Sequence, residues 1–321
     1  MSIILNQAGE DYDVIVNRKD GPPSREEFLA ATRDCDGVLI TLTEGIDEEF
    51  LSGASRLKVV SSFSVGLDHV DVDACTRHGV LVTNTPDVLT DATADMAFAL
   101  ILASLRRVVE GDRYIREGNW SGAWSHNLLV GRDASGATLG IVGYGRIGRA
   151  VARRASGFGM RVVYYSRKKA GLHSQGDDAA TFLPLDELLK TADIVSVHLP
   201  LTRETRHLFG EREFSLMKES AVFVNTSRGG LVDQAALTNA LAQRKIFAAG
   251  LDVFEKEPIS HDDPLLKLDN VVLVPHLGSA SLNARAGMAR LAAENLIDAL
   301  EGRVPKAVAN LELLERVRLT Q

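Results

Sequence analysis

Short apolar runs rich in β-branched residues recur along the whole chain, and helical patterns separate most of them. The N-terminal third contains such runs at Asp13–Val16, Gly37–Leu42, Leu57–Ser62 and Val80–Asn84. Later runs lie at Leu139–Gly143, Arg161–Ser166, Asp193–Leu199, Ala221–Thr226, Phe247–Val253 and Val271–His276. Strands that alternate with helices form parallel sheets that are covered on both faces. The pattern therefore predicts an α/β fold.

The helical patterns divide the chain into two predicted domains. Ser24 and Glu27 have the spacing of a capping box, which marks a helix start. One long helix is expected over Thr90–Glu117, where the chain crosses into a second domain. Shorter helices are expected at Ile147–Ala155, Leu185–Lys190 and Gln234–Gln243, and a last long helix at Asn283–Leu300. Two domains agree with a length of 321 residues.

Composition excludes several other classes of protein. Hydrophobic residues make up 45% and charged residues 25% of the chain, which are ordinary globular values. The net charge of −7 argues against binding to nucleic acids. Cys35 and Cys75 lack the spacing of a zinc site or a disulfide framework, so no metal is expected. Without a signal-peptide pattern or a long apolar run, the sequence predicts a soluble protein of the reducing cytoplasm.

The most specific local motif is GYGRIG at residues 143–148, which follows the apolar run LGIV and precedes a helical pattern. In a strand–turn–helix of this kind, the first glycine (Gly143) allows the tight turn. The second (Gly145) lets the backbone approach a pyrophosphate, and the third (Gly148) lets the helix pack closely on the strand. The helix N-terminus then offers N–H groups to the phosphates. The motif predicts a dinucleotide-binding domain.

The end of the next predicted strand bears on which dinucleotide is bound. A carboxylate at this place would bind the ribose 2′-hydroxyl of NAD. Here the sequence has Ser166, Arg167 and Lys168 instead. A hydroxyl group followed by cations suits a 2′-phosphate. The sequence therefore predicts a preference for NADP over NAD, with NAD still usable.

Three later strand ends carry the side chains of a hydride-transfer site. Arg228 follows one strand, Asp252 and Glu257 follow the next, and His276 ends the third. Ligands of open α/β sheets bind outside the carboxyl ends of the strands. His276 is the natural proton donor, Glu257 would orient its ring, and Arg228 would bind a substrate carboxylate. Asp252 could accept a hydrogen bond from the nicotinamide carboxamide.

These residues resemble the D-isomer-specific 2-hydroxyacid dehydrogenases over nearly the whole chain. The segment LGIVGYGRIGRAVARRASGFGMRVVYYSRK is similar to the cofactor motif of that family, and HLPLTRETRHLF, VFVNTSRGGLVD, AAGLDVFEKEP and NVVLVPHLGSAS are similar to its later blocks. The family's catalytic Arg, Glu and His match Arg228, Glu257 and His276. SSFSVGLDHVDVDA and TNTPDVLTDATADMAFAL look most like glyoxylate/hydroxypyruvate and 2-ketogluconate reductases, which prefer NADPH.

The resemblance implies a Rossmann cofactor domain, residues 98–285, inserted into a flavodoxin-like substrate domain, residues 1–97 and 286–321. Both would be doubly wound parallel sheets with the active site in the cleft between them, and the cofactor domains would form a homodimer. The N–H groups of Ser64, Val65 and Gly66 would bind the substrate carboxylate, together with Arg228 and His276. The expected cofactor-binding residues are Gly143, Gly145, Arg146, Ile147, Gly148, Ser166, Arg167, Lys168, Pro200, Thr205, Thr226, Asp252, His276 and Gly278. His198 is expected to be structural or cofactor-adjacent.

The resemblance leaves other readings open. The family usually opens with a strand and a helix before the segment that DYDVIV resembles, and only about ten residues precede it here. Either that first unit is missing or the true start lies upstream. The expected activity is NADPH-preferring reduction of a small 2-keto acid. The alternatives are another branch, such as the lactate, phosphoglycerate, formate or phosphite dehydrogenases, and a corepressor-like scaffold that senses dinucleotides.

Overall fold

The computed structural model describes residues 9, 11–19, 21–167 and 180–318, without the side chains of residues 315–318. The chain forms two compact units. Unit 1 consists of Met1–Leu89 and Ala280–Gln321, and unit 2 of Thr90–Ser279. The units divide a few residues before the boundaries expected at 97/98 and 285/286. The first boundary lies earlier because helix α5 (Thr90–Leu105) packs on three elements of unit 2, namely α7 (Arg146–Ser156), β8 (Val222–Asn225) and β9 (Ala248–Leu251).

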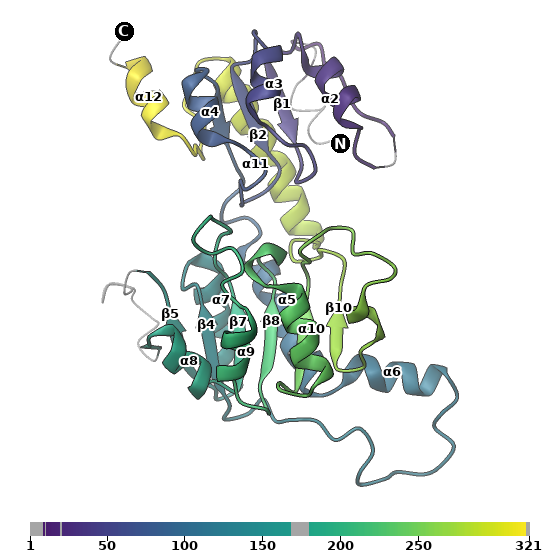
Figure 1. Ribbon diagram of the computed structural model, residues 1–321. Helices are drawn as coiled ribbons and strands as arrows, with labels where there is room; N and C mark the ends of the chain where they lie inside the picture. Colours follow the sequence, from purple (N-terminus) through teal and green to yellow (C-terminus); the bar gives the residue numbers. More distant parts are fainter. Residues whose placement is uncertain (1–8, 10, 20, 168–179, 319–321) are drawn as a thin grey trace. The chain divides into compact units, whose positions relative to one another are not determined.

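Unit 2 is built on a seven-stranded sheet with the order β10-β9-β8-β7-β4-β5-β6 (Figure 1). Every neighbouring pair is parallel. This order is that of a doubly wound dinucleotide-binding sheet with one added strand, so the predicted fold class is confirmed. The strands are β4 (Thr138–Val142), β5 (Arg161–Tyr165), β6 (Thr181–Phe182), β7 (Ile194–Val197), β8 (Val222–Asn225), β9 (Ala248–Leu251) and β10 (Val271–Leu273). Sequence patterning missed β6, because two residues show no periodicity.

The helix expected over Thr90–Glu117 is wrong as a single element. It consists of α5 and α6 (Val108–Arg116), and the break lies at Arg107, whose φ of 54° is left-handed. The carbonyl of Leu105 accepts a 2.9 Å hydrogen bond from Arg132 N instead of continuing the helix. The other helices of unit 2 are α7 (Arg146–Ser156), α8 (Leu185–Thr191), α9 (Glu211–Leu216), α10 (Gln234–Ala242) and the 3₁₀ turns η1 (Gly229–Leu231) and η2 (Pro264–Lys267).

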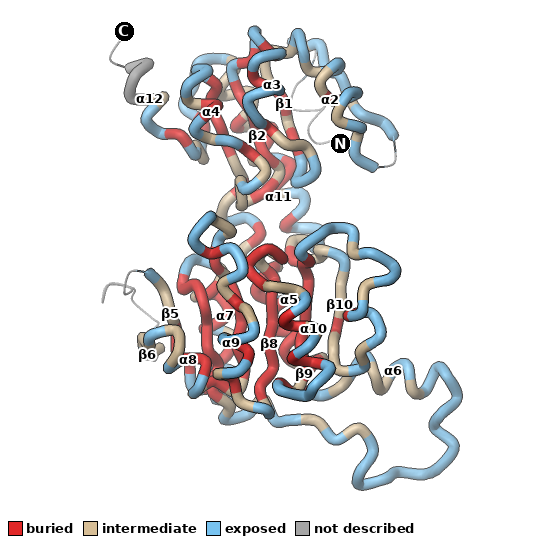
Figure 2. Tube along the Cα trace, in the orientation of Figure 1, coloured by how far each residue is buried: buried red, intermediate tan, exposed pale blue. Residues whose placement is uncertain are grey.

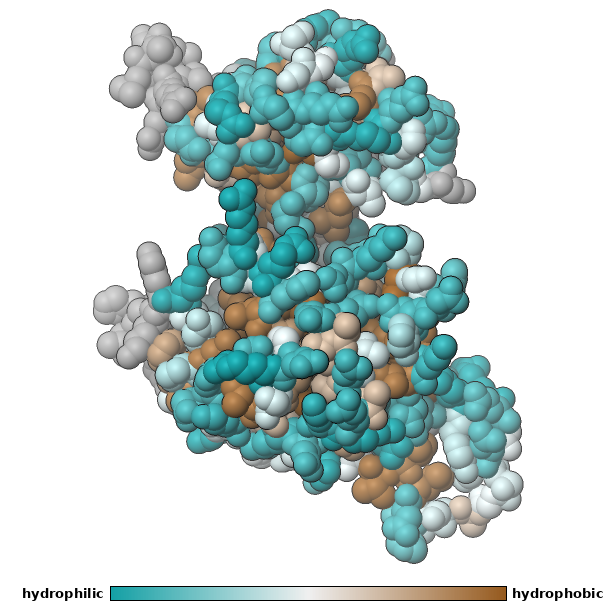
Figure 3. All heavy atoms as spheres, viewed as in Figure 1, coloured by the Kyte–Doolittle hydropathy of each residue, from teal (hydrophilic) through white to brown (hydrophobic). Residues whose placement is uncertain are grey.

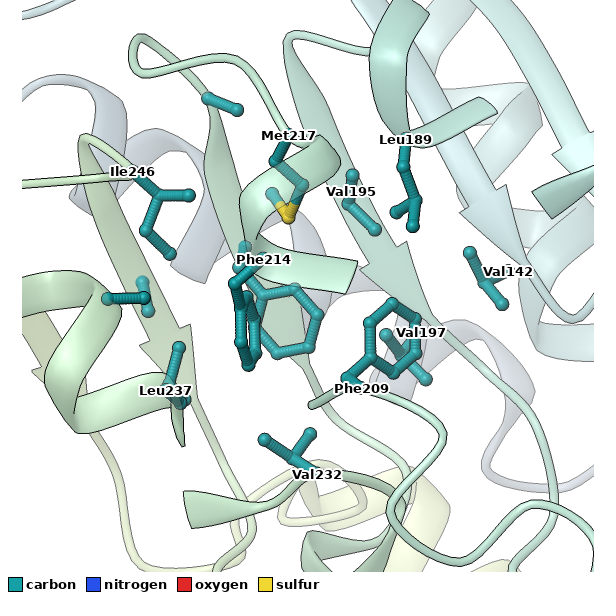
Figure 4. Packing of buried hydrophobic residues seen from close by; sticks show 14 of the residues in the cluster. Val142, Leu189, Val195, Val197, Phe209, Phe214, Met217, Val232, Leu237 and Ile246 are labelled. Atoms are coloured by element: carbon teal, nitrogen blue, oxygen red, sulfur yellow. The ribbon is translucent and has the colours of Figure 1, made fainter. Parts of the chain in front are cut away.

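The central strands of unit 2 are buried on both faces, as a parallel sheet between helices requires (Figure 2). On one face the helical side chains pack onto β7 and β8 (Figure 4). Phe223 of β8 meets Phe209 and Phe214, with ring centroids 5.1 and 5.3 Å apart. These edge-to-face contacts fill the space below the strand ends, so the sheet gives a rigid base to the loops that follow each strand.

Unit 1 is built on a smaller parallel sheet with the order β1-β2-β3. Its helix α11 (Leu282–Leu300) packs on all three strands. Gly37 permits this approach, because a Cβ there would lie 2.8 Å from Leu296 Cδ1. The other elements are β1 (Gly37–Ile40), β2 (Val59–Ser62), β3 (Leu81–Thr83), α2 (Arg25–Thr32), α3 (Glu48–Gly53), α4 (Val72–Arg77) and α12 (Leu311–Arg318).

In unit 1 the predicted capping box is present, whereas the predicted first strand is not. The capping box is confirmed, because Ser24 Oγ accepts from Glu27 N and the Glu27 carboxylate accepts from Ser24 N. The strand expected at Asp13–Val16 is wrong. This segment pairs with no described strand, and the side chain of Ile15 stays 67% exposed. Within the described part of the chain, no helix is both long enough and apolar enough to cross a membrane.

Candidate active site

Two glycines of the 143–148 loop are required by contacts within the protein. Gly143 has a φ of 103°, and a Cβ there would lie 2.6 Å from the carbonyl carbon and oxygen of His198. A Cβ on Gly148 would lie 2.2 Å from the carbonyl oxygen of Gly143. The first close approach joins the turn to the end of β7, and the second seats α7 against the turn. Both agree with the packing roles that the motif predicts.

Gly145 differs, because a Cβ there would meet no protein atom within 4 Å. It is the N-cap residue of α7, and this helix end has no side-chain cap and no acidic residue in its first turn. Nothing in the fold of unit 2 therefore demands a glycine at residue 145. The open space beside Gly145 would let a pyrophosphate approach the N–H groups at the start of α7.

Other expected cofactor residues lie at strand ends of the same sheet. Ser166 and Arg167 directly follow β5, whereas Lys168 lies outside the described residues. Thr226 directly follows β8, and its buried Oγ1 has no hydrogen-bond partner among the described residues. A buried hydroxyl group normally has a partner, so a bound molecule at this strand end would satisfy it.

Hydrogen bonds within the loop after β7 stabilise its conformation. Thr205 Oγ1 donates to the carbonyl of Pro200 at 2.8 Å and accepts from Thr202 N at 2.8 Å. Beside this loop, His198 Nε2 lies 2.8 Å from Ser196 Oγ. Burial lowers the pKa of His198 to about 4, so its ring is neutral near pH 7.

The loop after β8 presents Arg228 and is fixed by backbone contacts. Asn225 Nδ2 donates to the carbonyl of Arg228 at 2.9 Å, and Arg228 Nη1 donates to the carbonyl of Ser227 at 2.8 Å. The next residue, Gly229, touches the loop after β9 so closely that a Cβ would lie 1.8 Å from the carbonyl oxygen of Phe254. No side chain fits there, so the two loops are in direct backbone contact.

The loops after β9 and β10 bring Glu257 and His276 together. Glu257 Oε2 lies 2.7 Å from His276 Nδ1, and Glu257 Oε1 accepts from Phe254 N at 3.1 Å. Burial acts to raise the pKa of Glu257. The hydrogen bond to His276, with smaller contributions that include the charge of Arg228, outweighs burial, so the pKa lies below its usual value. A carboxylate on Nδ1 leaves Nε2 of His276 to exchange a proton.

Asp252 has a second role, which the sequence did not indicate. Its Oδ2 accepts from Gly278 N at 2.8 Å, its Oδ1 accepts from Leu277 N, and its carbonyl accepts from His276 N at 2.9 Å. The side chain is fully buried, and burial raises its pKa. Three bonds from one residue therefore hold the turn in which His276 has a left-handed φ of 53°. The expected bond to a carboxamide remains a proposal.

The segment Ser64–Gly66 of unit 1 has the backbone arrangement of an anion site. Thr85 N donates to the carbonyl of Ser64 at 2.8 Å, Asn84 Nδ2 to that of Val65 at 2.9 Å, and Ser64 Oγ to that of Gly66 at 2.7 Å. No described residue accepts a hydrogen bond from the N–H groups of the same three residues. With its carbonyls occupied and its N–H groups available, the segment suits a carboxylate ligand.

A glycine-to-alanine pair separates folding from binding in the 143–148 loop. Gly148→Ala forces a Cβ against the Gly143 carbonyl, so we expect the free energy of unfolding to fall by about 1–3 kcal/mol. Gly145→Ala meets no protein atom, so stability should change by about 1 kcal/mol or less while dinucleotide affinity falls at least about tenfold. Denaturant unfolding and calorimetric titration measure the two effects. Equal dinucleotide affinity in wild type and Gly145→Ala would contradict this assignment.

Among the described residues, no group of three or more His, Cys, Asp or Glu side chains is arranged to hold a metal ion. The loops after the strands of unit 2 carry an imidazole–carboxylate pair, formed by His276 and Glu257. Arg228, Glu257 and His276 are supplied by the loops after three successive strands of unit 2 (Figure 1).

Comparison with known proteins agrees with a dinucleotide-binding domain in unit 2. Residues 98–278 match the family model of the NAD-binding domain of D-isomer specific 2-hydroxyacid dehydrogenases. A glyoxylate reductase from Korarchaeum cryptofilum is 48% identical over 311 residues, which cover 97% of this chain and 93% of the relative. The crystal structure of a glyoxylate reductase from Paecilomyes thermophila is 36% identical, with a TM-score of 0.81 and coverage of 90% of this chain and 89% of that one.

A second solved structure is an NADPH-dependent glyoxylate/hydroxypyruvate reductase from Sinorhizobium meliloti in complex with NADP and malonate. It is 35% identical, with a TM-score of 0.79, and the match covers 87% of this chain and 85% of that one. The family match covers more than half of the chain, and the relatives align over nearly all of it. The protein therefore belongs to the D-isomer specific 2-hydroxyacid dehydrogenases and is an oxidoreductase with an NAD(P)-binding domain.

Proposed function

We propose that the protein reduces a small 2-keto acid (glyoxylate, hydroxypyruvate or 2-ketogluconate) to the D-2-hydroxy acid, with NADPH preferred over NADH. The observation that carries the proposal is the 2.7 Å hydrogen bond between Glu257 and His276 in an NAD(P)-binding unit. The names of the relatives, which are glyoxylate reductases, support the substrate class.

Each of the proposed site residues has a defined role in the reduction. NADPH, when bound, supplies a hydride to the keto carbon. His276 donates a proton from Nε2 to the keto oxygen, because Glu257 holds Nδ1 and stabilises the imidazolium form. Arg228 polarises the carbonyl and binds the carboxylate with its planar donor fork. The N–H groups of Ser64, Val65 and Gly66 also bind the carboxylate.

The preference for NADPH is supported by the residues after β5. Ser166 and Arg167 stand where a carboxylate would favour NAD, and Lys168 follows them in the sequence. Glu204, from the loop after β7, lies near enough for the charge of Arg167 to act on it. Its pKa is lowered first by a hydrogen bond from Thr202 and, to a smaller extent, by Arg167. Arg167 therefore lies within electrostatic range of this loop, at the strand end where the motif places the adenosine ribose.

The test of this function is a set of initial rates of NADPH and NADH oxidation against glyoxylate, hydroxypyruvate, 2-ketogluconate, pyruvate and phenylpyruvate. We expect fast NADPH-dependent turnover of one of the first three. His276→Ala should lower kcat by about 10²–10⁴-fold because the proton donor is lost. Ser166→Asp combined with Arg167→Ala should shift the preference toward NADH. Normal turnover by His276→Ala, or no turnover of any keto acid by wild type, would refute the proposal.

The pH dependence of reduction tests the role of Glu257. Its pKa lies below the usual value, so it is a carboxylate at neutral and alkaline pH and favours the protonated form of His276. Glu257→Gln removes that charge, so reduction should fail at a lower pH than in wild type as the pH is raised. We expect kcat to fall at least about tenfold at pH 7. An unchanged kcat–pH profile would show that Glu257 does not act on the proton donor.

We also propose that unit 2 forms a homodimer through α6 and the segment that follows it. No residue of α6 is buried, although Val108 and Ile115 are apolar. Trp124 in the following segment is 84% exposed. Hydrophobic residues are visible at the lower right of the surface, in the region of this segment (Figure 3). An exposed apolar surface of this kind is typical of a subunit interface.

Sedimentation equilibrium tests the dimer. Wild type should sediment as a dimer, and Ile115→Glu should shift it to a monomer because a buried unpaired charge is costly at an interface. Leu311→Glu is the matched control, since Leu311 is 60% exposed at the start of α12 in unit 1. A monomeric wild type, or the same oligomeric state in both variants, would contradict the proposal.

The two free cysteines, Cys35 and Cys75, agree with the reducing cytoplasm as the proposed compartment.

A further inference from the structure

A chain of polar side chains lies directly behind the Ser64–Gly66 segment. Ser62 Oγ is 2.7 Å from Ser64 Oγ and 3.3 Å from His69 Nε2, and Ser64 Oγ donates to the carbonyl of Gly66 at 2.7 Å. Ser62 is fully buried at the end of β2, and Ser64 is 4% exposed. The contacts therefore run through the interior of unit 1 and end on the backbone of the proposed anion site.

The number of available protons determines which group donates in each hydrogen bond of this network. A hydroxyl group has one proton to donate. Ser64 uses its proton on the carbonyl of Gly66, so Ser62 must donate to Ser64. Ser62 then has no second proton for His69, so His69 Nε2 must carry a hydrogen and donate it to Ser62. All three hydrogen bonds of this network therefore point the same way. His69 Nε2 donates to Ser62 Oγ, Ser62 Oγ donates to Ser64 Oγ, and Ser64 Oγ donates to the carbonyl of Gly66.

The far end of the chain is fixed to the body of unit 1. The carbonyl of His69 accepts a 2.9 Å hydrogen bond from Ile46 N. Asp71 N in turn donates to the carbonyl of Ile46 at 2.8 Å, and Asp71 caps α4 through Ala74 N at 2.8 Å. His69 is thus held by backbone bonds next to a helix start, and it can act as an anchor for the two serines.

We propose that His69 and Ser62 are positioning residues that keep the Ser64–Gly66 N–H groups directed at the substrate carboxylate. This inference rests on the proposed function, because it gives the same segment its ligand. The physical reason is that each carbonyl of the segment must be held by a donor for the N–H groups to stay outward. Ser64 supplies the donor for Gly66, and Ser62 and His69 orient the Ser64 hydroxyl.

The neighbouring serine provides a matched control. Ser61 is also fully buried in β2, and its hydroxyl donates to the carbonyl of Ala292 in α11 at 2.8 Å and accepts from Thr83 Oγ1 at 3.0 Å. Ser61→Ala therefore removes a buried hydroxyl group from the same strand without touching the Ser64–Gly66 segment. A general loss of stability in unit 1 would appear in both serine variants.

The experiment compares steady-state kinetics of wild type, Ser62→Ala, Ser61→Ala, His69→Leu and His69→Gln with the keto acid that wild type reduces. We expect Ser62→Ala and His69→Leu to raise KM for the keto acid about tenfold, with kcat and KM for the dinucleotide within about twofold of wild type. His69→Gln keeps an N–H donor near the place of Nε2 and should recover most of the affinity. Ser61→Ala should keep the wild-type KM.

Nitrogen-15 NMR of the histidine side chains provides a readout that does not depend on turnover. The signal of His69 can be identified because it is missing from the spectrum of His69→Gln. In wild type this signal should show a proton on Nε2. A proton on Nδ1 alone, or equal KM values for Ser62→Ala and Ser61→Ala in an active enzyme, would overturn the inference and leave the proposed function standing. A wild type that reduces no keto acid would overturn both.

Discussion

All seven strands of unit 2 run in the same direction, and the positions of Arg228, Glu257 and His276 follow from this constraint. In a parallel sheet the carboxyl ends of the strands share one edge, so the loops after β4, β5, β7, β8, β9 and β10 gather there. Buried strands and tightly packed aromatic rings keep that edge rigid (Figures 2 and 4). Contacts between the loops then hold Glu257 and His276 in place, because Asp252 fixes the turn of His276 and Glu257 contacts its ring.

Two carboxyl groups at this edge have opposite pKa shifts for a physical reason. Both lose water, which favours the neutral form of an acid. Asp252 is completely buried and its pKa is raised, although it accepts two backbone N–H bonds. Glu257 faces the imidazole of His276 and its pKa is lowered. One acid therefore holds the turn that carries His276, and the other acts on its ring.

Backbone groups do much of the work that the motifs suggest for side chains. Gly229 brings two loops into direct contact, because no Cβ could fit against Phe254. Gly145 has open space beside it, where a phosphate could approach. In unit 1 the Ser64–Gly66 carbonyls are occupied and the N–H groups are available. Successive backbone N–H groups of this kind can bind a small anion without a charged side chain.

Periodicity and strand-end residues determined much of this protein from the sequence alone: the α/β class, nine of the ten described strands of the two sheets, helix α7, and the pairing of Glu257 with His276. They did so because apolar periodicity and the strand–turn–helix glycines are local signals. Tertiary structure alone decided the break at Arg107, the lack of a strand partner for Asp13–Val16 among the described residues, and the hydrogen bonds that Asp252 accepts from Leu277 and Gly278. Each of these depends on contacts between residues that are distant in sequence or on backbone angles, and neither is encoded in a local pattern.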